Sequence, residues 1–360
     1  MRLGVWLIVP LVLALLGVGA WLRLREVQGT YATSGLAVGI CQANGEIAEE
    51  TRQELSSAAL SFLELFARSP NEARELMSER GRAATVDRAS LEGAHAIYRS
   101  METVSPPVVT ETYLVRFLGG SEGGSRVPCG FVGGRAAFVS RGGTLSSAVV
   151  LVAEEFAGGS GRTTSVWIER ENGAWRIRAL NFGISRIVGK GSAELWEAAR
   201  NQRGRGNDFN AAMLYAAARS ALQRGPFYQD RLMQDFNADI STFLAPDIVR
   251  GDAPFTWTFG GETFEVTQVQ YVGFESGDVA LVIDHAPSAW TENAEAEAIN
   301  RRLIDSFSAA YPEWREVFDA VVARAAKPNS NQRWGTVYRR SVGYSDTPNI
   351  ERQGDVLASP

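Results

Sequence analysis

The chain has 360 residues, of which 45% are hydrophobic and 21% are charged, and its formal net charge is −5 at pH 7. This length leaves room for about two globular domains after a short N-terminal segment, and the composition is that of a folded protein. The acidic balance excludes an electrostatic footprint for nucleic acid. Two histidines and two cysteines exclude His-rich zinc motifs such as HExxH. We therefore expect no metal, no cofactor and no nucleic-acid partner.

The chain begins with an uncharged apolar stretch over residues 3–22, whose length matches the about 20 residues that span a bilayer core as a helix. Two interpretations stay open. A retained anchor over residues 1–25 fits the apolar run through Trp21 and the basic stop at Arg23 and Arg25. A cleaved signal peptide fits the small residues 18–20. We adopt the anchor, and its bilayer positions are Leu3, Trp6, Pro10, Trp21 and Leu22.

The orientation of this anchor decides where the rest of the chain lies. A very short N-terminal tail usually stays in the cytoplasm. We therefore expect a single-pass protein of a bacterial-type inner membrane, with the bulk of the chain in the periplasm. In that oxidising compartment Cys41 and Cys129 could form a disulfide. The sequence sets no distance between the two residues, and two free buried thiols fit it as well.

Helical patterns follow the anchor. Residues 26–44 contain Gly, Ser and Thr with few periodic apolar positions and predict a linker. A helix is predicted over residues 46–68, because apolar residues recur there at three- and four-residue steps. Ser69 has the residue type of a helix cap, so a second helix follows it, and a third is predicted over residues 88–100. The apolar face of the first helix consists of Leu55, Ala59, Phe62 and Phe66.

From residue 104 the hydrophobic pattern changes to that of strands. Segments rich in β-branched and aromatic residues alternate with glycine pairs, which predicts an antiparallel sheet. The expected strands are residues 108–117, 126–132, 135–140 and 147–156.

A hairpin over residues 165–179 gives the clearest local signal, because Asn172-Gly173 is the preferred two-residue turn. This turn fixes the strand register if no residue is inserted. One face should then pack on the helices, and the other should pair opposite charges and set a guanidinium beside an indole. The expected pairs are Arg170 with Trp175, Glu169 with Arg176, Ile168 with Ile177, Trp167 with Arg178, and Val166 with Ala179.

Three helices and a sheet that ends in this W-x-x-x-x-N-G-x-W-x-I hairpin resemble the NTF2-like (cystatin-like, SnoaL-type) family over residues 46–185. A single span followed by such a domain also resembles the VirB8-type subunits of bacterial secretion machines. The resemblance implies a domain over residues 45–188 in which helices and a curved sheet enclose a cone. In NTF2-like enzymes the cone can hold an acid–base group, and the local candidates are His95 and Tyr113. A structural role for His95 fits the sequence as well.

A second domain is expected after a glycine-rich, charged linker over residues 189–206 that brackets a short helix. Residues 207–344 predict α+β structure, and the polar residues 345–360 predict a disordered tail. Asp284 and His285 are neighbours at the end of an expected strand. Adjacent strand residues point to opposite faces, so these two form no catalytic dyad by themselves.

The sequence thus predicts an α+β protein with an N-terminal transmembrane helix, an NTF2-like domain and a second α+β domain. We expect a non-enzymatic accessory or scaffold subunit of a larger membrane assembly, whose partners are integral membrane or envelope proteins and the lipid bilayer. The alternative is a small-ligand-binding protein or an enzyme that uses the cone. A filled cone would favour the scaffold, and a lined cavity would favour the alternative.

Overall fold

The computed structural model of the protein describes residues 39–84, 88–99, 102–117, 125–129, 136–140, 146–250, 253–287, 290, 292–328 and 332–344. The expected anchor over residues 1–25 and the expected tail over residues 345–360 lie outside these ranges. Within them, no helix is both long enough and apolar enough to cross a membrane. The described chain forms three sheets and eight α-helices, which confirms the expected α+β class.

The first helix forms where the apolar spacing predicts it, and its spaced apolar residues are fully buried along one face. Acidic Glu49 and Glu50 occupy its first turn, where they complement the helix dipole. The helix ends before Ser69, whose hydroxyl accepts the backbone N–H of Glu72 and caps the next helix. The helices of this part are α2 (Glu49–Arg68), α3 (Pro70–Glu75), α4 (Glu79–Ala84) and α5 (Arg88–Arg99).

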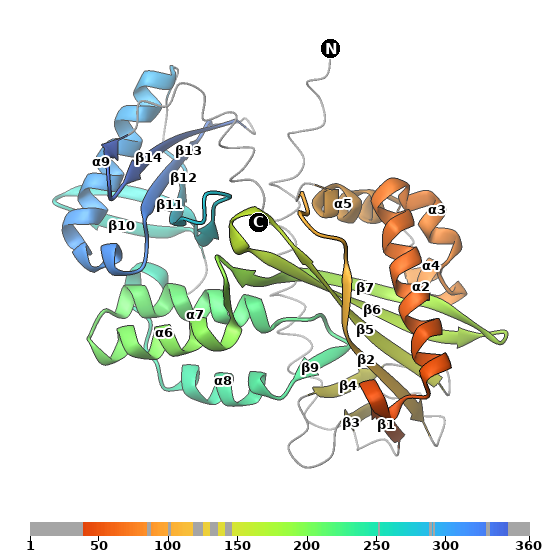
Figure 1. Ribbon diagram of the computed structural model, residues 1–360. Helices are drawn as coiled ribbons and strands as arrows, with labels where there is room; N and C mark the ends of the chain where they lie inside the picture. The colour runs from red at the N-terminus through yellow and green to blue at the C-terminus, as the bar shows by residue number, and fades with distance from the viewer. Residues whose placement is uncertain are drawn as a thin grey trace.

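A six-stranded antiparallel sheet lies against these helices (Figure 1). Its register is interrupted by extra residues at Thr110, Arg178 and Ser185. Such bulges bend a strand and increase its twist, so the sheet is curled. In spatial order its strands are β1 (Gly39–Ala43), β2 (Val108–Phe117), β5 (Ser146–Glu155), β6 (Gly161–Glu171), β7 (Ala174–Ile187) and β8 (Lys190–Gly191).

The β6–β7 hairpin confirms the expected turn, since Asn172 and Gly173 both have positive φ, of 51° and 82°. The three expected pairs nearest the turn are also confirmed. Beyond them the uninterrupted register is wrong, because the bulge at Arg178 moves Trp167 opposite Ala179 and Val166 opposite Leu180. The guanidinium carbon of Arg178 still lies 5.7 Å from the centre of the Trp167 ring. The bulge therefore changes the backbone pairing and keeps the cation–π contact.

The described parts of two segments expected to be linkers form secondary structure. Residues 39–43 of the expected linker 26–44 form β1, which pairs with β2. Residues 190–204 form β8 and α6 (Ser192–Gly204), although only a short helix was expected there. Leu195 and Ala199 of α6 are fully buried against α7 (Asp208–Leu222). Burial of this apolar stripe joins α6 to the fold, so residues 189–206 do not act as a linker.

A small three-stranded sheet covers the face of the large sheet opposite α2 (Figure 1). Its third strand comes from beyond α7, so the chain returns to the first unit after the expected domain boundary. α8 (Leu232–Ser241) follows this strand. The strands of the small sheet are β3 (Ser125–Cys129), β4 (Ala136–Ser140) and β9 (Tyr228–Asp230).

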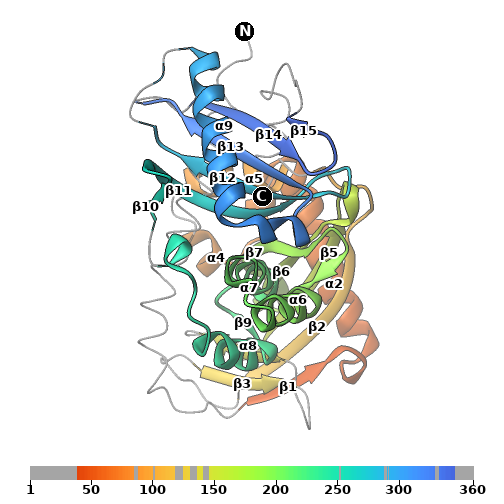
Figure 2. The ribbon, with the colours of Figure 1, turned by 90° about the vertical axis from the view of Figure 1, so that its left-hand side faces the viewer.

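The last part of the chain forms a mixed six-stranded sheet that lies beside the first unit (Figures 1 and 2). β12 and β13 are parallel, and the chain joins them through α9 (Asn293–Ala310) and a short 3-10 helix, η4 (Pro312–Glu316). Both pack on one face of the sheet around Phe307 and Trp314, which are fully buried. The strands in spatial order are β10 (Phe255–Phe259), β11 (Glu262–Gly273), β12 (Val279–His285), β13 (Ala320–Ala326), β14 (Arg333–Arg339) and β15 (Gly343–Tyr344).

The two units touch directly as well as through α7, which packs on both β7 and β11. Gly158, in the turn between β5 and β6, has φ of 72° and lies against the backbone of Phe274 after β11. A Cβ at Gly158 would stand 2.2 Å from the carbonyl oxygen of Phe274. Only glycine satisfies both the positive φ and this close approach.

Candidate functional site

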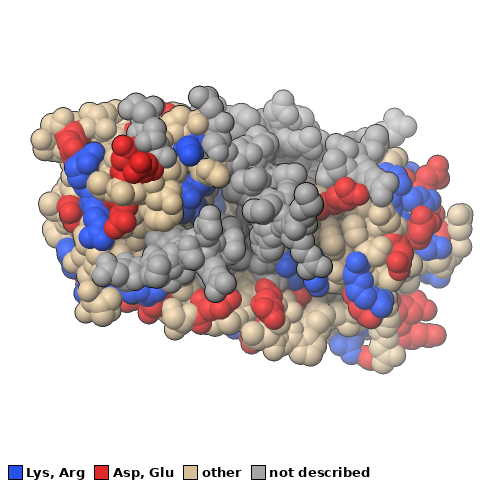
Figure 3. All heavy atoms as spheres, turned by 90° about the horizontal axis from the view of Figure 1, so that it is seen from above, with Lys and Arg blue, Asp and Glu red and all other residues tan. Residues whose placement is uncertain are grey.

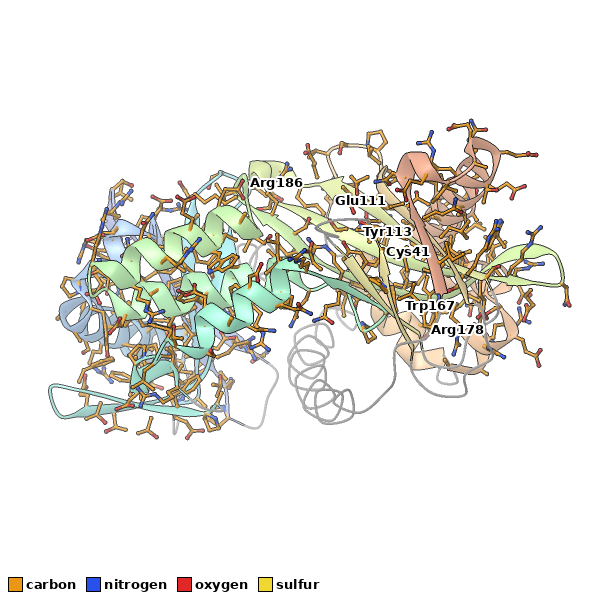
Figure 4. All side chains as sticks on the ribbon, turned by 90° about the horizontal axis from the view of Figure 1, so that it is seen from below. Cys41, Glu111, Tyr113, Trp167, Arg178 and Arg186 are labelled. Atoms are coloured by element: carbon orange, nitrogen blue, oxygen red, sulfur yellow. A yellow bond between two sulfur atoms is a disulfide. The ribbon has the colours of Figure 1, made fainter. Side chains whose placement is uncertain are left out.

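Tyr113 lies on β2 and is buried on the face of the large sheet that the small sheet covers. Its hydroxyl donates a hydrogen bond to a carboxylate oxygen of Glu111 on the same strand. The centre of its ring lies 5.6 Å from the ring centre of Tyr228 on β9. Figure 4 shows Glu111, Tyr113 and Cys41 close together on this side of the strands. The candidate from the sequence therefore sits at the contact between the two sheets.

The surroundings of Tyr113 and Tyr228 favour the protonated form of both phenols. Burial, and then the neighbouring Tyr228, raise the pKa of Tyr113, and burial followed by Glu111 raises the pKa of Tyr228. Burial lowers the pKa of Arg224, which lies near the same groups. Both phenols therefore stay protonated at neutral pH and act as hydrogen-bond donors. A general base needs a pKa near the working pH, which these phenols do not have.

The two cysteines form a disulfide between these sheets. Cys41 lies on β1 and Cys129 on β3, with 5.0 Å between their Cα atoms and a sequence separation of 88. Cys129 is almost fully buried, and Cys41 packs in the same cluster. We use the name clasp for the small sheet β3–β4–β9 together with the Cys41–Cys129 disulfide and the Tyr113–Tyr228 contact. The clasp connects β1, the edge strand of the large sheet, to β9, after which the chain continues through α8 to the second unit.

His95 lies elsewhere, on α5. Its Nε2 is 3.3 Å from the carbonyl oxygen of Ala67, and its ring meets the ring of Phe66 edge to face at 5.6 Å. Phe66 belongs to the core between the helices and the large sheet, whereas Tyr113 faces the clasp. The structure thus places the two candidates on opposite sides of the sheet and gives them no common site.

The space between the helices and the large sheet is occupied by packed apolar side chains. They come from α2, α5 and the inward face of the strands, and they form one buried cluster. Large members include Phe62, Phe66 and Met77, each no more than 1% exposed. The region that the resemblance describes as a cone is therefore a core in this protein.

A buried polar cluster that sequence reasoning missed lies at the edge of this core. Arg162 on β6 binds both carboxylate oxygens of Glu154 on β5, at 2.7 and 2.8 Å. Tyr98 of α5 donates its hydroxyl to Glu154 at 2.8 Å, and its ring lies 3.5 Å from the guanidinium carbon of Arg162. The exposed fractions of Arg162 and Glu154 are only 2% and 3%. The sequence does contain a signal for this cluster. The glycine-rich turn at residues 158–161 places the opposite charges of Glu154 and Arg162 directly across the hairpin from each other.

The second unit contains two separate polar groups at the end of β12. The carboxylate of Asp284 binds Arg324 at 2.5 and 2.8 Å and Arg333 at 2.8 Å. His285 points to the other face, where its Nε2 lies 2.6 Å from the Oδ1 of Asn300 on α9. The inference that these neighbours form no dyad is confirmed. Burial lowers the pKa of His285, so its imidazole is neutral at pH 7.

Charged side chains on the visible surface are mixed in sign. On the face shown in Figure 3, Lys and Arg side chains lie among Asp and Glu side chains over both units. Ion pairs between exposed side chains of the second unit include Arg302 with Glu262 and Arg340 with Asp319. The described part of this face therefore presents neither a basic nor an acidic field.

No protein-family model matches this sequence, and no curated protein or solved structure is similar to it at a significant level. Within the described ranges, no group of three or more His, Cys, Asp and Glu side chains could hold a metal ion. A functional proposal therefore rests on the packing and the contacts described above.

Proposed function

We propose that this protein is a non-enzymatic accessory or scaffold subunit that works outside the cytoplasm. The observation that carries the proposal is the Cys41–Cys129 disulfide. Disulfides persist in oxidising compartments such as the bacterial periplasm and are rare in the cytosol. The apolar residues 3–22 would hold the chain in the inner membrane. Its partners would then be integral membrane or envelope proteins of a larger assembly.

The contacts inside the two units support a structural role. The core behind α2 is filled with apolar side chains, and Tyr98, Tyr113 and His285 each hold a fixed hydrogen bond. The clasp, α7 and the close approach at Gly158 link the two units. A body that is cross-connected in this way presents surfaces in a fixed relation to one another, which is what a scaffold needs. The packed core gives the alternative, a ligand in the cone, no support.

The NTF2-like resemblance forms a finer part of this proposal, and with it the VirB8-type architecture. It is supported by the order of elements, in which helices α2 to α5 precede a curled antiparallel sheet of β2, β5, β6 and β7. The Asn172-Gly173 hairpin lies at the expected place in that order. A fold of this kind hosts many functions, so the resemblance concerns the architecture and leaves the partner open.

Native membranes extracted with a mild detergent, fractionated by size and analysed by mass spectrometry, test this proposal. We expect the intact N-terminus, co-migrating subunits in constant ratio, and Cys41 and Cys129 that react with a thiol reagent only after reduction. A variant with both cysteines changed to serine controls for the reagent. A soluble monomer that lacks residues 1–20, or free thiols in the native protein, would contradict the proposal.

A further inference from the structure

β10 is the outermost strand of the second sheet, where β11 is its only strand neighbour among the described residues. Figures 1 and 2 show it at the periphery of the molecule. Thr256 and Thr258 are exposed, whereas Trp257 is fully buried under α9 and donates its indole N–H to the carbonyl oxygen of Ile248. One side of β10 is thus fixed in the core, and its outer edge faces away from the sheet.

The turn after β10 determines which backbone groups point outward. Gly260 and Gly261 have φ of 55° and 90°, and Phe259 pairs with Glu262 across this two-residue loop. In such a hairpin the pair next to the turn is hydrogen-bonded, and hydrogen-bonded pairs then alternate along the strands. The N–H and C=O groups of Thr256 and Thr258 therefore point away from β11. No hydrogen bond joins them to the described part of the chain.

The composition of β10 suits pairing with itself. Its five residues, Phe-Thr-Trp-Thr-Phe, read the same in both directions and carry no charge. Natural edge strands usually prevent pairing with lysines, bulges or proline. The only proline here, Pro254, precedes the strand, and β10 pairs with β11 without a bulge.

We propose that β10 is a self-association edge, on which a second copy of this chain pairs its own β10 in antiparallel orientation. A two-fold axis at Trp257 sets Thr256 opposite Thr258 of the other copy, and Thr258 opposite Thr256. These are the residues whose backbone groups point outward, so both pairs form reciprocal hydrogen bonds. The axis stands perpendicular to the sheet, so the two α9 helices lie on the same face of a continuous sheet.

Charge does not oppose this pairing along the strand itself. The charged residues on either side of β10 are paired within the chain, Arg250 with Asp247 and Glu262 with Arg302. No like charges meet along the five paired residues, because all of them are neutral. A parallel or unrelated partner strand would gain none of this symmetry.

The first test measures the mass of the purified full-length chain in detergent by light scattering as a function of concentration. We expect a dimer, and Thr258→Lys should weaken it roughly tenfold or more, because like charges enter a neutral edge. Thr263→Lys is the matched control, since Thr263 is exposed on β11 opposite Thr258 but lies away from the edge. A chain that stays monomeric, or a dimer that Thr258→Lys leaves intact, overturns the proposal.

The second test is disulfide trapping of the predicted register. The double variant Thr256→Cys/Thr258→Cys should form a covalent dimer on mild oxidation, because opposed residues of a hydrogen-bonded pair have Cα atoms about 5.5 Å apart. Thr263→Cys should not, and the native cysteines are already bonded to each other. Equal trapping of both variants would refute the register. These results do not depend on whether the protein is a membrane-anchored scaffold, so the two proposals can fail separately.

Discussion

Removal of the Glu154 carboxylate should destabilise the protein by an amount that follows directly from the contacts of Arg162. Arg162 is 2% exposed, and two of its three hydrogen bonds go to Glu154. Glu154→Ala therefore leaves a buried guanidinium with one remaining hydrogen bond, to the carbonyl oxygen of Tyr98. Breaking a buried ion pair by removing one partner costs about 3–5 kcal/mol. Solvent screening does not reduce this figure, because both side chains are almost fully buried.

Three further variants separate the charge from the hydrogen bonds. Glu154→Gln keeps an oxygen acceptor and should cost about 1.5–3 kcal/mol, and Tyr98→Phe, which removes one donor, about 1 kcal/mol. The double variant Glu154→Leu/Arg162→Met removes both charges and should be less destabilised than Glu154→Ala alone. Urea unfolding, followed by circular dichroism and by tryptophan fluorescence, measures all four. A loss below about 1 kcal/mol for Glu154→Ala, or a double variant worse than it, would refute this reasoning.

Three other predictions concern the clasp, the second unit and the contact between the units. Reduction of the disulfide, or the double variant Cys41→Ser/Cys129→Ser, should lower the free energy of unfolding by about 2–5 kcal/mol, because the disulfide closes a long loop in the unfolded chain. A reducing agent that leaves the urea midpoint unchanged would contradict this. Burial lowers the pKa of His285, so the unfolded chain takes up its proton first, and His285 should cost stability as the pH falls below about 6.5. His285→Gln should lose less stability than the native chain between pH 7 and pH 5, and an equal loss would rule out the effect. Gly158→Ala should lower stability by at least about 1–3 kcal/mol through the positive φ alone, with a further cost from the contact with Phe274; an unchanged melting temperature would disprove it.

Local sequence patterns correctly predicted several elements of the fold. The apolar spacing of α2, the cap at Ser69 and the Asn172-Gly173 turn involve residues within one or two turns of each other, and all three are confirmed. The hairpin register failed at one residue, Arg178, because a bulge depends on how the whole sheet curls. A single inserted residue leaves no mark on the alternation of neighbouring side chains.

The candidate site was less accessible to sequence reasoning. Tyr113 was named through the resemblance to NTF2-like enzymes. Its neighbour Tyr228 follows it by more than a hundred residues and comes from the other side of the expected domain boundary. The glycines and charges around residues 189–206 predicted a linker. The buried Leu195 stripe of α6 outweighed that local signal, because burying an apolar face stabilises a helix that flanking glycines alone would not favour.

The sequence by itself determined the α+β class, the buried face of α2, the two-residue turn, and the presence of two cysteines that could pair. Its apolar N-terminal stretch also raised the expectation of a membrane anchor. Only the tertiary structure decided that Cys41 meets Cys129, that β9 completes a sheet of the first unit, and that His95 and Tyr113 lie on opposite sides of the large sheet. The physical reason is range: turns and helical faces depend on nearby residues, whereas sheet partners and disulfides depend on segments that meet only when the whole chain is packed.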